Sequence, residues 1–244
     1  MSEWFEDWFS TEEYLYVYRH RNNDDAVDLF NLILKNIEIE PGAKVLDLAC
    51  GAGRHSILFA KNGYDVTSVD LSENLLNVAR KSAEELMLNI NIIKSDLRLL
   101  NLADRFQLII NLFTSFGYFE QDFENEKIIK IVEQQLNENA YFVLDFFNVV
   151  HLKKNLIPIS YDKIEEAIIR QERTFDQGRI VKKITVIKKN SERSYFESVR
   201  AYSKSELSSM ILKNGLKIIK IFGDYSGNAF DEDNSSRIII IAQK

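Results

Sequence analysis

One short stretch constrains this chain more than any other: Val45-Leu46-Asp47-Leu48-Ala49-Cys50-Gly51-Ala52-Gly53-Arg54-His55. It opens with an apolar, β-prone run and continues with two glycines one residue apart. An apolar run at helical spacing then begins at Ile57. This order predicts a strand, a tight glycine turn and a helix. Glycine is needed where the backbone turns sharply or approaches a ligand closely, and the following helix offers unpaired N–H groups at its N-terminus.

A second acidic position lies about 20 residues further along. Residues 65–69 have the composition of a strand, and Asp70 follows them. In nucleotide-binding α/β folds, an acidic residue at this place accepts hydrogen bonds from ribose hydroxyls. Gly51, Gly53 and Asp70 together therefore predict a pocket for a nucleoside.

Two kinds of nucleoside cofactor fit this spacing. The dinucleotide fingerprint requires a third glycine, but Ser56 occupies that position. Asp47 would repel a pyrophosphate, whereas it suits the cationic, phosphate-free S-adenosylmethionine (SAM). The segment from Asp47 to Gly53 resembles the first motif of class I SAM-dependent methyltransferases, and Asp70 matches the acidic residue of their second motif.

The resemblance implies a set of cofactor contacts beyond the glycine turn. Asp96 and Leu97 follow a predicted strand at 90–94 and resemble adenine contacts, with an aspartate that caps a turn as the alternative. The residues expected at SAM are Tyr14, Tyr18, Asp47, Ala49, Gly51, Gly53, Arg54, His55, Asp70, Leu71, Asp96, Leu97, Asn111, Leu112 and Phe113.

The loop at 112–119 is long and aromatic, and its position predicts a wall of the methyl-transfer site. Methyltransferases that act on exocyclic base amines carry two prolines here, but this chain has Asn111-Leu112-Phe113-Thr114. The run Thr-Ser-Phe-Gly-Tyr-Phe resembles a branch of class I enzymes that act on small molecules. Tyr118 and His151 are the candidate substrate contacts, with a purely structural role as the alternative for His151. No catalytic base is assigned.

The N-terminal segment is rich in aromatic residues. Ser10 and Glu13 have the spacing of a capping box, which predicts a helix from Thr11. Tyr14, Tyr18 and Arg21 would share one face of it. The segment either docks by its aromatic residues alone or also forms a lid over the cofactor.

The order of elements predicts an α/β fold. Strands expected at 44–48, 65–69, 90–94, 106–111 and 139–147 alternate with helices at 54–62, 73–87 and 123–136. We expect a Rossmann-like, seven-stranded, mostly parallel sheet with helices on both faces. An antiparallel insertion of about three strands should occupy 164–175, 179–188 and 193–202. The expected domains are a helical lid (1–37), a SAM-binding core (38–150), the β insertion (151–202) and the closing elements of the core (203–244).

The bulk properties limit the partners. The net charge of −6 argues against a broad phosphate-tracking surface, so we expect no nucleic acid partner. No apolar run approaches the roughly 20 residues that span a bilayer, and the acidic N-terminus does not resemble a signal peptide. The single cysteine fits a reducing compartment. We therefore expect a cytoplasmic protein, monomeric or homodimeric, with no metal site.

Three functions compete at this point. The first is a SAM-dependent methyltransferase acting on nitrogen or oxygen of a small molecule. The second is a non-catalytic, SAM-binding regulatory protein. The third is a nicotinamide-dependent oxidoreductase, which Asp47, Ser56 and the lack of a Tyr-x-x-x-Lys pair disfavour.

Overall fold

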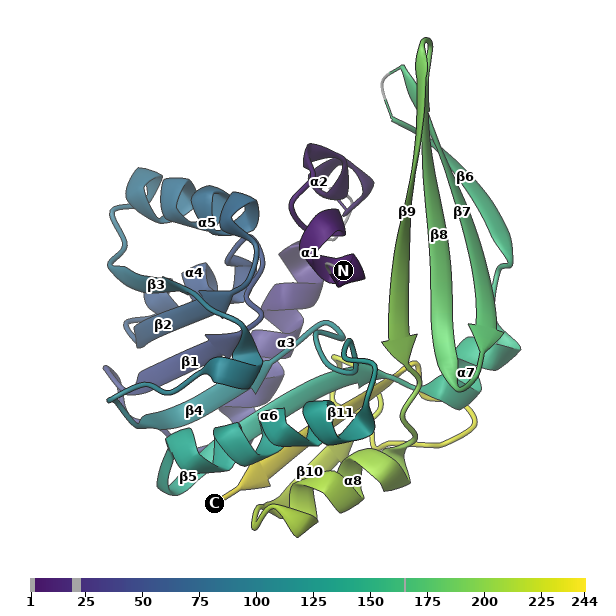
Figure 1. The fold of residues 1–244 in the computed structure, drawn as a ribbon. Helices are drawn as coiled ribbons and strands as arrows, with labels where there is room; N and C mark the ends of the chain where they lie inside the picture. Colours follow the sequence, from purple (N-terminus) through teal and green to yellow (C-terminus); the bar gives the residue numbers. More distant parts are fainter. Residues whose placement is uncertain (1–2, 19–22, 165) are drawn as a thin grey trace.

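A seven-stranded sheet forms the centre of the molecule (Figure 1). The structure is a computed structural model that describes residues 3–18, 23–164 and 166–244. The strand order is β10-β11-β5-β4-β1-β2-β3, and β11 alone runs antiparallel to the other six strands. The strands are β1 (Lys44–Leu48), β2 (Asp65–Asp70), β3 (Ile90–Lys94), β4 (Phe106–Asn111), β5 (Leu136–Phe147), β10 (Lys217–Phe222) and β11 (Arg237–Gln243).

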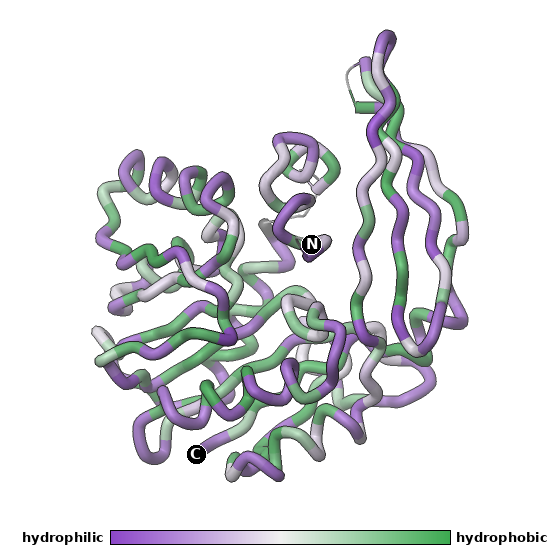
Figure 2. The backbone as a smooth tube through the Cα atoms, viewed as in Figure 1, coloured by the Kyte–Doolittle hydropathy of each residue, from purple (hydrophilic) through white to green (hydrophobic). Residues whose placement is uncertain are grey.

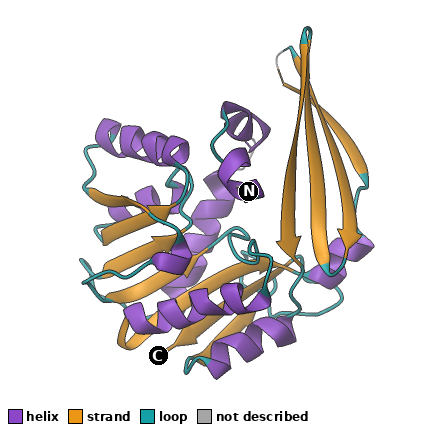
Figure 3. Ribbon diagram, in the orientation of Figure 1, coloured by secondary structure: helices purple, strands orange, loops and turns teal. Residues whose placement is uncertain are grey.

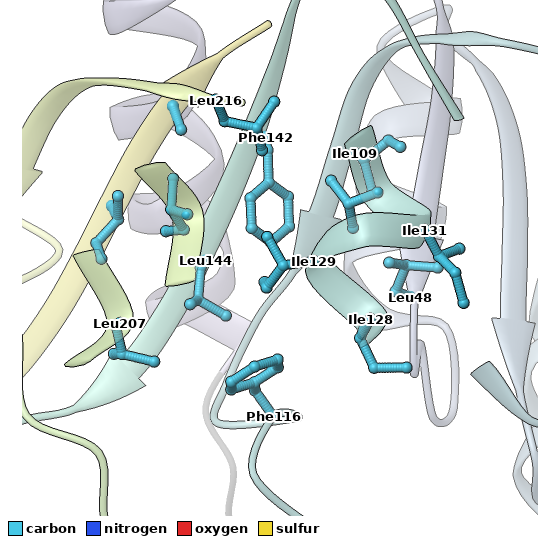
Figure 4. Close-up of a cluster of buried hydrophobic side chains, with 14 of the residues drawn as sticks. Leu48, Ile109, Phe116, Ile128, Ile129, Ile131, Phe142, Leu144, Leu207 and Leu216 are labelled. Atoms are coloured by element: carbon cyan, nitrogen blue, oxygen red, sulfur yellow. The ribbon is translucent and has the colours of Figure 1, made fainter. Parts of the chain in front are cut away.

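Helices cover both faces of this sheet, because its central strands are apolar on both sides. Ile109 faces α6 in one hydrophobic cluster that also includes residues of α8 (Figure 4), while its neighbours Leu108 and Ile110 belong to the cluster beneath α3 and α4. Figure 2 shows apolar residues along these strands. The helices are α3 (Asn23–Asn36), α4 (Arg54–Lys61), α5 (Glu73–Glu85), α6 (Asp122–Gln135) and α8 (Lys204–Lys213), with a 3-10 turn, η1, at Leu97–Leu99. The predicted α/β class and the seven-stranded sheet are confirmed.

The insertion is a four-stranded antiparallel sheet, so the expected number of about three strands was wrong. It contains β6 (Ile159–Ile164), β7 (Ala167–Asp176), β8 (Arg179–Lys188) and β9 (Ser191–Arg200). The additional strand, β6, is an edge strand whose residues are mostly exposed, so it lacks a buried apolar pattern. A short helix, α7 (Val149–Lys154), leads into it and was not predicted; Asn148 Oδ1 accepts a hydrogen bond from Val150 N (3.1 Å) at its start.

Two short N-terminal helices, α1 (Trp4–Trp8) and α2 (Glu12–Tyr18), lie between the main sheet and the insertion (Figures 1 and 3). The sequence did not predict α1. The predicted capping box was also wrong, because Thr11 Oγ1 accepts from Tyr14 N (3.2 Å) while the Ser10 hydroxyl bonds back to Glu6 O. Thr11 therefore precedes α2 as its cap and is not its first residue.

The insertion packs on these helices through a small cluster of its own. Trp8 and Val17 are buried against four branched side chains of the insertion: Ile164, Ile169, Ile184 and Val186.

No helix within the described residues is long and apolar enough to cross a membrane. The division into four domains remains our proposal.

Candidate functional site

A cleft of about 280 Å³ opens at the carboxyl ends of β1, β2 and β4. Eleven of the predicted site residues line it: Tyr14, Tyr18, Asp47, Ala49, Gly51, Arg54, His55, Asp70, Leu112, Phe113 and Tyr118. Six further residues complete the lining and were not singled out from the sequence: Phe9, Leu15, Cys50, Ala52, Leu75 and Ser115. Parallel strands bring their carboxyl ends to one edge, which is why segments far apart in the sequence meet here.

The glycine turn forms the floor of the cleft. Ala49, Gly51 and Gly53 all have positive φ, at 55°, 56° and 77°. A Cβ on Gly53 would also lie 2.8 Å from Ala79 Cβ on α5, so glycine is needed there for close packing as well as conformation. Gly53 shapes the start of α4 without lining the cleft itself.

Asp47 is a buried carboxylate in the wall of the cleft. Its side chain is 3% exposed, and its Oδ2 accepts a hydrogen bond from Ser56 Oγ at 2.6 Å. Burial raises the pKa of Asp47 to about 7, and the charge of Asp70 acts in the same direction. Ser56, which breaks the dinucleotide fingerprint, therefore has a role of its own in orienting this carboxylate.

Asp70 ties the end of β2 to the glycine turn. Its Oδ2 accepts from Gly51 N and its Oδ1 from Ser72 N, both at 2.8 Å. Burial raises the pKa of Asp70 despite these backbone hydrogen bonds. Each carboxylate oxygen can accept one bond more, so the side chain is able to take hydroxyl donors from a ligand.

The opposite side of the cleft is aromatic and basic. The Arg54 guanidinium lies 4.0 Å from the centre of the Phe113 ring, and His55 contacts the same ring with centroids 5.2 Å apart. His55 is buried, and burial together with the charge of Arg54 lowers its pKa to about 3. His55 is therefore neutral at physiological pH and too weak a base to deprotonate an ammonium group.

A second, smaller cavity of about 60 Å³ adjoins the cleft. It contains the predicted residues Leu71, Asp96 and Leu97, and five residues line both spaces: Phe9, Ala49, Asp70, Ser115 and Tyr118. A ligand that continues from Asp70 to Leu97 would have to pass between the side chains shared by the two cavities.

The Asp96 carboxylate is already engaged within the protein. Its Oδ1 accepts from Arg98 N (2.8 Å), and its Oδ2 lies 2.6 Å from Arg98 Nη2. Burial would raise the pKa of Asp96, but the hydrogen bonds and charge of Arg98 lower it below its usual value. Arg98 also binds Glu3 and Glu124 at 2.7 and 2.8 Å. The turn-capping alternative thus describes the carboxylate of Asp96 in this structure, while its backbone remains at the cavity.

The structure does not bring every candidate into this group. Asn111 is buried, and its Nδ2 donates to Leu48 O (3.0 Å) and Ser115 O (3.2 Å), so it joins β1 to the loop without lining the cleft. His151 lies on α7, outside the lining of both cavities. His20 and Arg21 fall outside the described residues. Burial raises the pKa of the Cys50 thiol, which keeps it protonated.

The N-terminal helices close the cleft from above. Phe9 lines both cavities, and its carbonyl accepts from Ser72 Oγ at 2.6 Å. On the other side, Trp8 Nε1 donates to Glu197 Oε1 of β9 at 2.7 Å. The insertion therefore contacts the N-terminal helices, and none of its described residues lines the cleft.

Among the described residues there is also no cluster of acidic, histidine or cysteine side chains that could hold a metal ion.

Comparison with known proteins agrees with this geometry. A family model for a methyltransferase domain matches residues 45–139. A Geobacillus sp. (strain WCH70) protein whose name places it among methyltransferases is 22% identical over 245 residues, covering 96% of this chain and 99% of that protein.

Solved structures share the fold along most of the chain. A SAM-dependent methyltransferase from Clostridium acetobutylicum superposes with a TM-score of 0.82 at 19% identity, covering 95% of this chain and 97% of that one. The amino pentose methyltransferase CalS10 of Micromonospora echinaspora, solved with SAM bound, has a TM-score of 0.68 at 18% identity, covering 96% and 97%. The sugar N-methyltransferase KedS8 of Streptoalloteichus has a TM-score of 0.71 at 14% identity, covering 95% and 92%. Residues 45–139 thus form a methyltransferase domain, the chain has the fold of SAM-dependent methyltransferases along most of its length, and SAM is the methyl donor of this domain.

Proposed function

We propose that this enzyme transfers the methyl group of SAM to a nitrogen or oxygen atom of a small molecule, within the cleft beneath α1 and α2. The observation that carries the proposal is the pairing of two buried carboxylates, Asp47 and Asp70, in one enclosed aromatic cleft. Burial disfavours the charged form of each, so a cationic ligand is favoured there and an anionic diphosphate is not.

The placement of SAM follows from these groups. Its ammonium would lie near Asp47 and its carboxylate near Arg54, at the N-terminus of α4. Asp70 would accept hydrogen bonds from the ribose hydroxyls with the acceptor capacity that Gly51 and Ser72 leave open. The adenine would extend toward Leu71 and Leu97, where the smaller cavity must widen to admit it.

Methyl transfer requires little from the protein beyond alignment of the reactants and exclusion of water. When bound, SAM supplies a methyl group already activated by its sulfonium, and the acceptor lone pair displaces the sulfur in line. Phe113, Tyr118 and the rings of α1 and α2 would exclude water and hold the acceptor on that line. A neutral amine can lose its proton after transfer, so no catalytic base is assigned.

The size and character of the cleft support a small acceptor. Its outer walls are aromatic side chains, namely Phe9, Tyr14, Tyr18, Phe113 and Tyr118. Two of the structural neighbours are named as methyltransferases of an amino pentose and of sugar nitrogen, which supports an amine or hydroxyl on a sugar-sized molecule. No nucleic acid partner is expected, and a monomer or homodimer in the cytoplasm remains our prediction. Tyr118 is the preferred substrate contact, because His151 lies apart from the cleft.

The test combines binding and turnover. Calorimetry with SAM, with its demethylated product S-adenosylhomocysteine and with NAD should show binding of the first two and none of the third. Turnover is then measured as release of S-adenosylhomocysteine from a panel of amino sugars, phenols and alkylamines. Binding without turnover on any amine or hydroxyl would contradict the acceptor class, and NAD binding would contradict the cofactor placement.

A further inference from the structure

The loop after β4 holds two consecutive side chains in an unfavourable backbone conformation. Phe113 and Thr114 have φ of 55° and 63°, in the left-handed region that glycine favours. Such a conformation persists only where the surroundings enforce it, and it often occurs at functional sites. Phe113 lines the cleft, so the conformation of this loop decides where one wall of the cleft lies.

One buried carboxylate makes most of the contacts that enforce this conformation. Asp145 of β5 is 0% exposed, and its Oδ2 accepts a hydrogen bond from Phe113 N at 2.9 Å. Its backbone carbonyl accepts from Thr114 N at 3.0 Å. Asp145 therefore binds the amide groups of both strained residues.

Two further residues complete the arrangement from the other side of the loop. Arg237 of β11 lies 2.8 Å from Asp145 Oδ1 through both Nε and Nη2, and its Nη2 also donates to Thr114 Oγ1 at 3.1 Å. Tyr225 donates its hydroxyl to Asp145 Oδ2 at 3.0 Å and stacks its ring on Phe113, with centroids 5.6 Å apart. None of these three residues lines the cleft.

We infer that Asp145 is a positioning residue of this methyltransferase: with Arg237 and Tyr225 it holds Phe113 and Thr114 in the left-handed conformation and thereby fixes the Phe113 wall beside the methyl group. The inference deepens the proposed function and rests on its placement of SAM and acceptor in the cleft. Asp145 acts through Phe113, since it contacts neither space itself.

The experiment is a rescue series. Asp145→Asn keeps the size of the side chain but removes the charge that Arg237 needs, and it cannot serve all donors at once. Thr114→Gly removes the penalty for the left-handed conformation at 114 without changing the cleft lining. If Asp145 serves to hold Thr114 in its strained conformation, Thr114→Gly should restore part of the affinity that Asp145→Asn loses.

Three readouts separate positioning from simple loss of stability. We expect Asp145→Asn to weaken S-adenosylhomocysteine binding roughly tenfold, to lower turnover at saturating SAM further, and to accelerate hydrogen exchange of the Phe113 amide. The double variant with Thr114→Gly should recover at least about threefold in affinity. A general loss of stability would lower the melting temperature without weakening the affinity of the folded protein, so the recovered affinity reports on the loop.

A control variant tests the same region without touching the strained pair. Asn148 is buried, and its Nδ2 donates to Glu232 O and Ser235 O at 2.8 Å, in the connection between β10 and β11 that also carries Tyr225. Asn148→Ala should lower the melting temperature while leaving S-adenosylhomocysteine affinity and Phe113 exchange at wild-type values.

If Asp145→Asn does not fold, Tyr225→Phe replaces it. This variant loses one hydroxyl hydrogen bond and keeps the ring stacked on Phe113; we expect a two- to fivefold loss of affinity, again recovered by Thr114→Gly. Unchanged affinity in the substituted protein, or a loss that Thr114→Gly leaves in place and Asn148→Ala reproduces, would overturn the inference. Failure of wild-type protein to bind S-adenosylhomocysteine would instead contradict the proposed cofactor site.

Discussion

At the scale of single residues, Asp47 is a site residue whose burial lowers the stability of the ligand-free protein. A carboxylate beside apolar strands and a second carboxylate is costly to ionise, which is why its pKa rises to about 7. A cation that enters the cleft offsets this cost. We expect the ligand-free enzyme to be less stable than its fold would allow, and the SAM complex to be correspondingly stabilised.

Asp47→Asn tests this trade-off through its dependence on pH. From about pH 4 to pH 7, native Asp47 retains a proton that the unfolded chain has released, so the unfolding free energy of the wild type falls as pH rises through this window. Asparagine does not titrate. In thermal unfolding without ligand, the unfolding free energy of the variant relative to that of the wild type should therefore rise by a few kcal/mol between pH 4.5 and pH 8. The affinity of the variant for SAM should decrease. A stability difference that is the same at both pH values would show that Asp47 carries no such cost.

Gly53 and Gly63 make a matched pair for a second residue-scale prediction. Both have positive φ, at 77° and 84°, but a Cβ would meet Ala79 Cβ at 2.8 Å only at Gly53, whereas nothing lies within 4 Å at Gly63. Gly63→Ala should cost about 1 kcal/mol from backbone strain alone. Gly53→Ala should cost roughly 1–3 kcal/mol more, because α4 and α5 must separate. Equal losses in chemical denaturation would contradict the close-packing role of Gly53.

At the scale of elements, the insertion acts on the cleft through the N-terminal helices. Glu197 of β9 accepts hydrogen bonds from Trp8 Nε1 and from the Tyr18 hydroxyl, and Lys182 Nζ lies 2.6 Å from that hydroxyl. These contacts join α1 and α2 to the insertion, while Ser72 joins Phe9 to the core. We propose that this pair of attachments keeps residues 3–18 closed over the cofactor.

Glu197→Gln tests this attachment. The variant loses the charge that faces Lys182 and can no longer accept equally well from both donors, so α1 and α2 should open more often. We expect faster hydrogen exchange in residues 4–18 and a weakening of SAM binding by about 1–2 kcal/mol. Glu192→Gln, an exposed position on the same strand, is the control and should change neither. Unaltered exchange in Glu197→Gln would mean that the apolar contacts of Trp8 and Val17 suffice.

At the scale of the whole molecule, local patterns predicted the main sheet well. The central strands β1 and β4 are buried on both faces and are mostly apolar, and β2 is β-prone although it contains Thr67 and Ser68. The glycine turn and Asp70 fix the edge where ligands bind. The start of α8 follows from an equally local pattern, since Ser203 Oγ accepts from Glu206 N at 3.2 Å in a capping box. These features depend on neighbours within a few residues or on strand order alone.

The features that escaped prediction depend on distant partners. Asp145 is one acidic residue in an apolar strand until β11 and the connection before it bring Arg237 and Tyr225 alongside. The turn-capping alternative for Asp96 could be stated from local spacing, but Glu3, which binds Arg98 from 95 residues away, could not be predicted. The strand β6 has no buried face that would mark it, since it is an edge strand of a sheet that covers the N-terminal helices.

The central claim is that Asp70 anchors SAM through its ribose at the end of β2, and calorimetric titration with S-adenosylhomocysteine tests it most directly. The titration compares the wild type with Asp70→Ala and with Asp65→Ala, an exposed substitution at the opposite end of the same strand. The account predicts one site per chain in the wild type, a loss of about 1–3 kcal/mol in binding free energy for Asp70→Ala, and no loss for Asp65→Ala. Equal affinity in all three proteins would contradict it.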